Sequence, residues 1–127
     1  MPQAEAFRQL VEARAGSSCE YCRLLQAAAG VIFHIEHIRP RSRGGRTQMS
    51  NLALSCPGCN LAKAERLTGK DNNGQVQPLV NPRNHQTWLL GWHLHFVLDL
   101  NSGLILPRTA VGEATINTLR ITGPSNR

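Results

Sequence analysis

The chain has 127 residues, of which 41% are hydrophobic, and these numbers predict one folded domain with a modest core and exclude a disordered chain. The formal net charge is +6, and residues 36–70, with seven basic and two acidic side chains, supply +5 of it, which favours a polyanionic partner. No apolar run approaches the ~20 residues that a membrane span requires. Glu5, Arg8 and Glu12 stand where a signal peptide would be apolar. We therefore expect a cytoplasmic protein with no membrane partner.

The first half of the chain is predicted to hold a helix, two strands and a second helix. Phe7, Leu10 and Val11 share one face of a helix over residues 4–15, with Gly16 placed to end it. Strands are expected over residues 31–38 and 51–55, and a short helix over 60–67. A basic loop with a Gly-Gly turn separates the strands. The order of the central elements is therefore strand, loop, strand, helix.

The second half begins with residues 71–85, whose many Asn, Gln, Gly and Pro residues indicate an extended connection. Residues 92–100 and 104–106 are expected to form a β-hairpin, with aromatic side chains in its core rather than serving to stack on bases. The last helix is expected over residues 111–120, capped by Thr109.

Four cysteines form two Cys-x-x-Cys pairs, Cys19 with Cys22 and Cys56 with Cys59. Two such pairs can place four thiolates around one tetrahedral Zn²⁺ ion. Two disulfides are the alternative, but the paired spacing is unusual for a disulfide framework and the expected compartment is reducing. Because protein ligands would fill all four positions, we expect this zinc to be structural.

The segment between and after the pairs contains several motifs in a fixed order: Glu36-His37-Ile38-Arg39-Pro40, Gly44-Gly45, Asn51-Leu52 and Cys56-Pro57-Gly58-Cys59-Asn60-Leu61-Ala62-Lys63. In these motifs the chain resembles the HNH endonucleases of the ββα-metal (His-Me finger) superfamily, in the subgroup clamped by four cysteines. Asn60 stands where a third histidine would give the family its name, so this is the HNN variant. The tail also resembles small stand-alone bacterial HNH proteins.

The resemblance implies roles for four residues in the hydrolysis of DNA phosphodiester bonds. His37 would be the general base that activates water, which suits an imidazole whose unperturbed pKa is near ~6.5. Glu36 and Asn60 would bind the catalytic metal, and their oxygen ligands favour Mg²⁺ or Mn²⁺. Asn51 would hydrogen-bond within the loop and hold the base in place, although an Asn in an ordinary turn is the alternative.

Other residues are candidates for supporting roles. His34 and Lys63 are candidates for assisting the site, and a solvent-facing His is the alternative for His34. Basic side chains around the site are candidates for binding DNA phosphates, which positions a duplex without specifying its sequence; a solvated loop is the alternative. This set comprises Arg39, Arg41, Arg43, Arg46, Lys63 and Arg66.

The resulting prediction is one α+β domain over residues 1–127, with a zinc-clamped ββα core at about 19–67. An N-terminal helix precedes the core, and a C-terminal extension at about 75–121, a hairpin plus a helix, packs on it. The alternative function is a zinc-knuckle module of the same fold that binds nucleic acid without turnover. Double-strand cutting by a protein with one active site per chain would call for a homodimer or for successive events.

Overall fold

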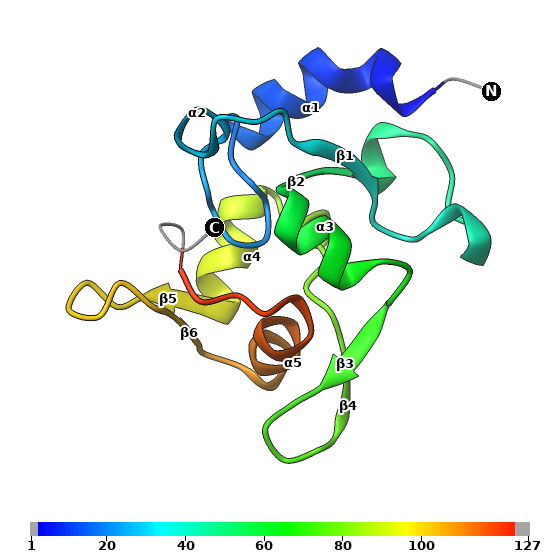
Figure 1. The fold of residues 1–127 in the computed structure, drawn as a ribbon. Helices are drawn as coiled ribbons and strands as arrows, with labels where there is room; N and C mark the ends of the chain where they lie inside the picture. Colours follow the sequence, from blue (N-terminus) through cyan, green and yellow to red (C-terminus); the bar gives the residue numbers. More distant parts are fainter. Residues whose placement is uncertain (1–2, 124–127) are drawn as a thin grey trace.

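A computed structural model describes residues 3–123 and has an α+β fold (Figure 1). The N-terminal helix begins with a 3-10 turn, Ala4–Phe7, and continues as α1, Arg8–Ala15. Gly16 ends it with φ of 63°, a left-handed conformation that glycine adopts without strain. The predicted helix over residues 4–15 is confirmed. A short helix that the sequence analysis missed, α2 (Gln26–Ala29), follows the first pair of cysteines.

The central elements have the predicted order of strand, loop, strand and helix. Strands β1 (His34–His37) and β2 (Leu52–Ser55) pair in antiparallel fashion. Helix α3, Pro57–Lys63, follows directly. The predicted bounds of this helix, 60–67, are wrong, because proline is accepted in the first turn of a helix and the helix therefore starts at residue 57.

Two short hairpins and two helices form the rest of the chain. Strands β3 (Thr68–Lys70) and β4 (Val76–Pro78) pair, so the predicted extended connection contains a strand. The predicted strand over 92–100 is wrong in its first part, where helix α4 (Trp88–His95) runs instead. The hairpin itself is present as β5 (Phe96–Leu98) and β6 (Ile105–Pro107), and α5 (Ala110–Leu119) ends the fold with the predicted Thr109 cap. The basic loop between β1 and β2 also contains two 3-10 turns, Arg41–Arg43 and Met49–Asn51.

Helix α5 joins the extension to the central elements. It contacts the β3–β4 hairpin, β6 and α3, while α1 packs on β2 (Figure 1). Trp92 and Phe96 lie fully inside the core, as expected, and each such side chain contributes roughly 1.5–3 kcal/mol on burial. The extension therefore packs on the core, while a single domain over 1–127 stays a prediction. No helix within residues 3–123 is long and apolar enough to cross a membrane.

Candidate active site and metal centre

The four cysteines lie together in the core. All four are reduced and buried, and their Sγ atoms all lie within 4.8 Å of one another. Sγ of Cys22 and Sγ of Cys56 are 3.7 Å apart, which is about the edge of a tetrahedron with Zn–S bonds of ~2.3 Å. Hydrogen bonds from the other cysteines, Cys19 above all, lower the pKa of the Cys56 thiol. The cluster fits a metal ion such as zinc, bound by sulfur alone.

Asn51 fixes the loop that follows β1. Its side chain accepts a hydrogen bond from the Arg39 amide at 2.8 Å and donates to the carbonyls of Arg39, at 3.0 Å, and Arg46, at 2.8 Å. Gly45 makes this closure possible, because a Cβ atom there would lie 1.7 Å from the Arg39 carbonyl oxygen. The position of Asn51 thus agrees with the loop-holding role that the sequence predicts.

His37 lies at the end of β1, half-buried, and its register partner on β2 is Leu52. Its Nε2 atom is 2.8 Å from the hydroxyl oxygen of Thr47, a buried residue of the loop. Burial, aided by the positive charge of Arg41, lowers the pKa of His37. The lowered pKa favours the neutral imidazole, the form that can accept a proton.

Glu36 points into the protein, where two side chains hold its carboxylate. The Tyr21 hydroxyl donates to Oε1 at 2.5 Å, and Nζ of Lys63 lies 3.0 Å from Oε2. Lys63 also donates to the Ile38 carbonyl at 2.8 Å. Burial raises the pKa of Glu36, and the charge of Lys63 and the Tyr21 hydrogen bond oppose that rise. The result is a buried ion pair that fastens α3 to β1.

The residue types of Glu36 and Asn60 suit a hard divalent ion. Asn60 precedes Lys63 by three residues on α3, so the two side chains lie on one face of the helix. Asn60 is half-buried. The amide oxygen of Asn60 and the carboxylate of Glu36 are the kind of ligand that Mg²⁺ or Mn²⁺ prefers. An ion at Glu36 would meet the Lys63 ammonium group, which already neutralises the carboxylate.

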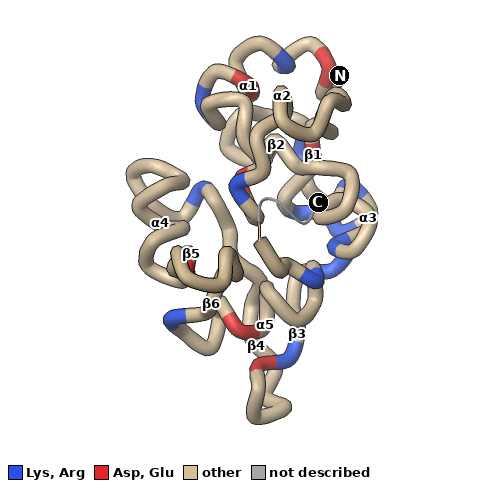
Figure 2. The backbone as a smooth tube through the Cα atoms, turned by 60° about the vertical axis from the view of Figure 1, so that its left-hand side comes forward, with Lys and Arg blue, Asp and Glu red and all other residues tan. Residues whose placement is uncertain are grey.

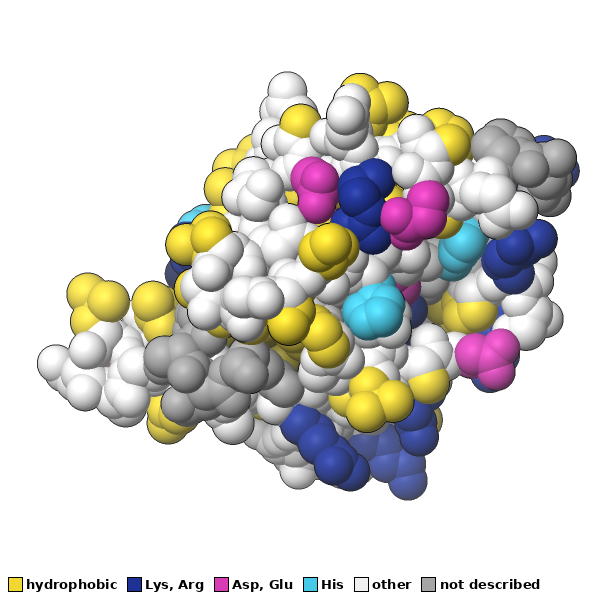
Figure 3. Space-filling view, turned by 45° about the horizontal axis from the view of Figure 1, so that its top comes forward, with side chains coloured by type: hydrophobic (Ala, Val, Ile, Leu, Met, Phe, Trp, Pro, Cys, Tyr) yellow, Lys and Arg dark blue, Asp and Glu magenta, His cyan; other side chains and the backbone are white. Residues whose placement is uncertain are grey.

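The predicted phosphate-binding residues divide into two groups. The five arginines are exposed, and their backbone positions gather beside β1 and α3 (Figure 2). Lys63 is only 1% exposed and pairs internally, so the prediction that it belongs to this surface does not fit its position. His34, on β1, is exposed. Figure 3 shows one face of the molecule on which side chains of histidine and of lysine or arginine reach the surface. The structure does not bring the His34 side chain into the Glu36 network.

Comparison with known families agrees with this geometry. Residues 19–66 match the family model described as HNH endonuclease. The chain carries an HNH endonuclease domain. The match starts at Cys19 and so includes both Cys-x-x-Cys pairs, as expected for the zinc-knuckle subgroup. No curated protein matches the chain. No solved structure matches it either. The HNH domain indicates nuclease activity in general and a nucleic acid as the substrate.

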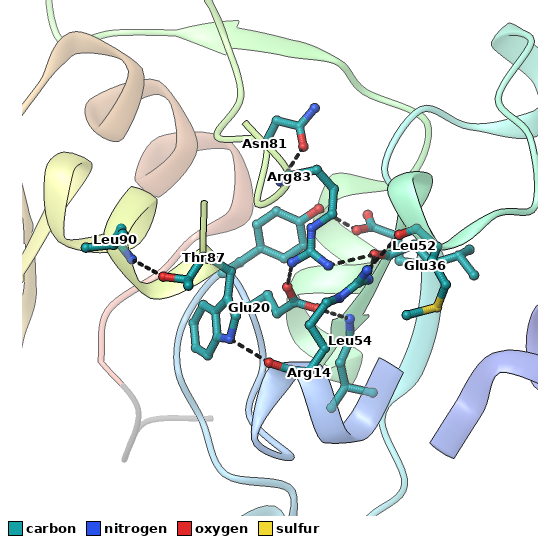
Figure 4. A network of polar contacts seen from close by, with 12 residues as sticks. Arg14, Glu20, Glu36, Leu52, Leu54, Asn81, Arg83, Thr87 and Leu90 are labelled. Atoms are coloured by element: carbon teal, nitrogen blue, oxygen red, sulfur yellow. Dashed lines mark hydrogen bonds and ion pairs between the residues drawn. The ribbon is translucent and has the colours of Figure 1, made fainter. Parts of the chain in front are cut away.

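The structure places residues around the candidate site that sequence reasoning missed. Tyr21 lies between Cys19 and Cys22. A large aromatic residue inside a Cys-x-x-Cys pair is visible in the sequence and could have marked it as a residue to consider. Thr47 lies in the basic loop and had no distinguishing pattern. A buried carboxylate, Glu20, pairs with Arg83, and Arg14 lies beside them (Figure 4). Arg14 and Arg83 lie outside residues 19–66, where the family motif gives no guidance.

Proposed function

We propose that this protein is a metal-dependent HNH endonuclease that hydrolyses DNA phosphodiester bonds, with His37 as the general base. The observation that carries the proposal is the placement of His37 within an HNH domain, half-buried and tied to Thr47 at 2.8 Å, beside exposed arginines. Zinc in the cysteine cluster would be structural. Mg²⁺ or Mn²⁺, held by Glu36 and Asn60, would supply positive charge for the phosphate and the leaving oxygen.

The contact between His37 and Thr47 is compatible with the tautomer that the reaction needs. If Nε2–H of His37 donates to the Thr47 hydroxyl oxygen, Nδ1 carries the lone pair and takes a proton from water. The resulting hydroxide forms a bond to phosphorus, the bond from phosphorus to the 3′ oxygen breaks, and that oxygen is protonated by solvent. The products are a 5′-phosphate and a 3′-hydroxyl.

Each of the other proposed residues has a part that its contacts support. Asn51 keeps the loop closed through three hydrogen bonds, so that Thr47 stays opposite His37. Arg39, Arg41 and their neighbours Arg43, Arg46 and Arg66 hold the DNA backbone by charge, so that binding weakens steeply with salt. Such contacts carry no base readout, so sequence preference is expected to be weak.

The test is cleavage of supercoiled plasmid by purified protein in Mg²⁺, in Mn²⁺ and in EDTA. His37→Ala should lose the metal-dependent nicking that the wild type shows. His93→Ala, which changes an exposed histidine of α4, is the matched control and should cut at the wild-type rate. Zinc content and melting temperature are measured for every variant. Equal cutting by wild type and His37→Ala would overturn the assignment of the base.

A second candidate is a nucleic-acid-binding module without turnover. One observation favours it: both oxygens of Glu36 already have partners, Tyr21 and Lys63. In that case neither wild type nor His37→Ala would cut, while both would retard DNA on a gel at low salt. RNA and branched DNA would be included as substrates in the same assay.

A further inference from the structure

Two arginines from outside residues 19–66 reach the strand that faces the proposed base. Arg14, on α1, donates from Nη1 to the carbonyl of Met49 at 2.8 Å and from Nη2 to the carbonyl of Leu52 at 2.5 Å. Arg83, which follows β4, contacts the same Leu52 carbonyl from Nη1 at 3.5 Å (Figure 4). Leu52 is the register partner of His37. Both cations therefore act on the backbone directly opposite the base.

Arg83 also neutralises a buried charge. Its Nη2 atom pairs with Oε1 of Glu20, whose side chain is 0% exposed. The other oxygen of Glu20 accepts a hydrogen bond from the Leu54 amide at 2.8 Å, and the Glu20 amide donates to the Leu54 carbonyl at 2.9 Å. Glu20 thus fastens the first cysteine pair to β2. Tyr21, the next residue, donates to Glu36, so one buried network joins Arg83 to the proposed site.

We propose that Arg83 is a positioning residue for the hydrolysis at His37, supplied by the C-terminal extension; this inference rests on the proposed function. Without Arg83, the Glu20 carboxylate is buried without its cation and β2 loses a donor at Leu52. A buried charge that loses its partner draws water or rearranges its surroundings. A shift of ~1 Å in a reacting group can cost ~10²-fold in rate. The side chain of Arg83 is only 12% exposed, so it has little surface with which to bind DNA.

The decisive experiment separates kcat from KM in plasmid nicking by the full-length, zinc-loaded protein. Arg83→Gln should lower kcat about 100-fold and change KM less than threefold. Arg83→Lys keeps the positive charge beside Glu20. Its single ammonium group replaces the two terminal nitrogens of the guanidinium group, so its kcat should be intermediate. Arg108→Gln, which removes an exposed arginine of the same extension, is the control for charge and should retain the wild-type kcat.

Two outcomes would overturn the inference: a wild-type kcat in folded Arg83→Gln, or a loss confined to KM. Should Arg83→Gln fail to fold, the double variant Glu20→Gln/Arg83→Gln removes the unpaired carboxylate. It should fold with full zinc and still have a low kcat, and a wild-type kcat in this variant would contradict the inference.

A failure of the proposed function can be distinguished from a failure of this inference. If the wild type does not cut under any condition, the nuclease assignment fails while the positioning role is still measurable. NMR signals of the His37 ring would then be compared between wild type and a folded Arg83 variant. A shift supports the positioning role, and superimposable ring signals refute it.

Discussion

At the scale of single residues, His37 depends on a neighbour that the sequence does not single out. Its strand position follows from the motif, but one of its ring nitrogens, Nε2, lies 2.8 Å from the hydroxyl oxygen of Thr47. Asn51 keeps that loop closed by binding the backbone at Arg39 and Arg46. A neutral imidazole has two tautomers, and the partner of one nitrogen decides which nitrogen is free to act as a base.

Thr47→Val tests this dependence, because valine has nearly the same shape and lacks the hydroxyl. The variant should fold with wild-type zinc content, since one side-chain contact is lost. Its kcat for plasmid nicking should fall about 10- to 100-fold, because part of the population then has the wrong tautomer or ring angle. Thr47→Ser restores the hydroxyl and should recover most of the rate. Wild-type cutting by Thr47→Val would show that Thr47 does not orient the base.

At the scale of elements, α3 is fastened to β1 by the ion pair between Lys63 and Glu36, whose side chains are 2% and 5% exposed. Sequence reasoning identified both residues from the motif and predicted the strand and helix that carry them. It could not predict that they pair, because lysine is rarely buried and its length allows many positions. Their pairing depends on how closely α3 approaches β1, which no local pattern encodes.

Lys63→Met should therefore lower stability strongly, because it leaves the Glu36 carboxylate buried without a cation. Breaking a buried pair from one side costs about 3–5 kcal/mol, which corresponds to a drop in melting temperature of more than about 10 °C for a chain of this size. The double variant Glu36→Gln/Lys63→Met removes both charges and should recover much of that loss. Thermal unfolding at constant zinc provides the measurement, and a single variant as stable as the wild type would contradict the pairing.

The strand predicted over residues 92–100 is wrong in its first part for a physical reason. Trp92 and Phe96 lie within residues 92–100, and such aromatic residues favour strands in isolation. Thr87 nevertheless caps a helix there by accepting a hydrogen bond from the Leu90 amide. The Trp92 indole then donates to the Tyr21 carbonyl at 2.8 Å and fixes the helix against the first cysteine pair. A tertiary contact thus overrides the local preference.

At the scale of the whole molecule, the cysteine cluster lies where distant parts of the chain meet. The first pair contacts α4 through Trp92, whose ring also lies 4.9 Å from the guanidinium of Arg23. The second pair is continuous with α3, since Cys56 caps that helix. All four sulfurs belong to the same core as Val11 on α1. A metal ion in the cluster would therefore join the N-terminal helix, the HNH core and the extension.

Removal of this metal should unfold the whole chain in one transition. A chain of this length has a small core, and the binding free energy of a structural zinc ion is part of the folding free energy of the protein. The two tryptophans both lie on α4, outside residues 19–66, so their fluorescence reports on the extension. A strong chelator should shift this tryptophan emission to longer wavelength and abolish the far-ultraviolet helical signal in the same transition. Added Zn²⁺ should restore both and Mg²⁺ neither, and Cys59→Ser should behave like the chelated protein. A chelated protein that keeps the wild-type melting temperature would show that packing alone holds the three parts together.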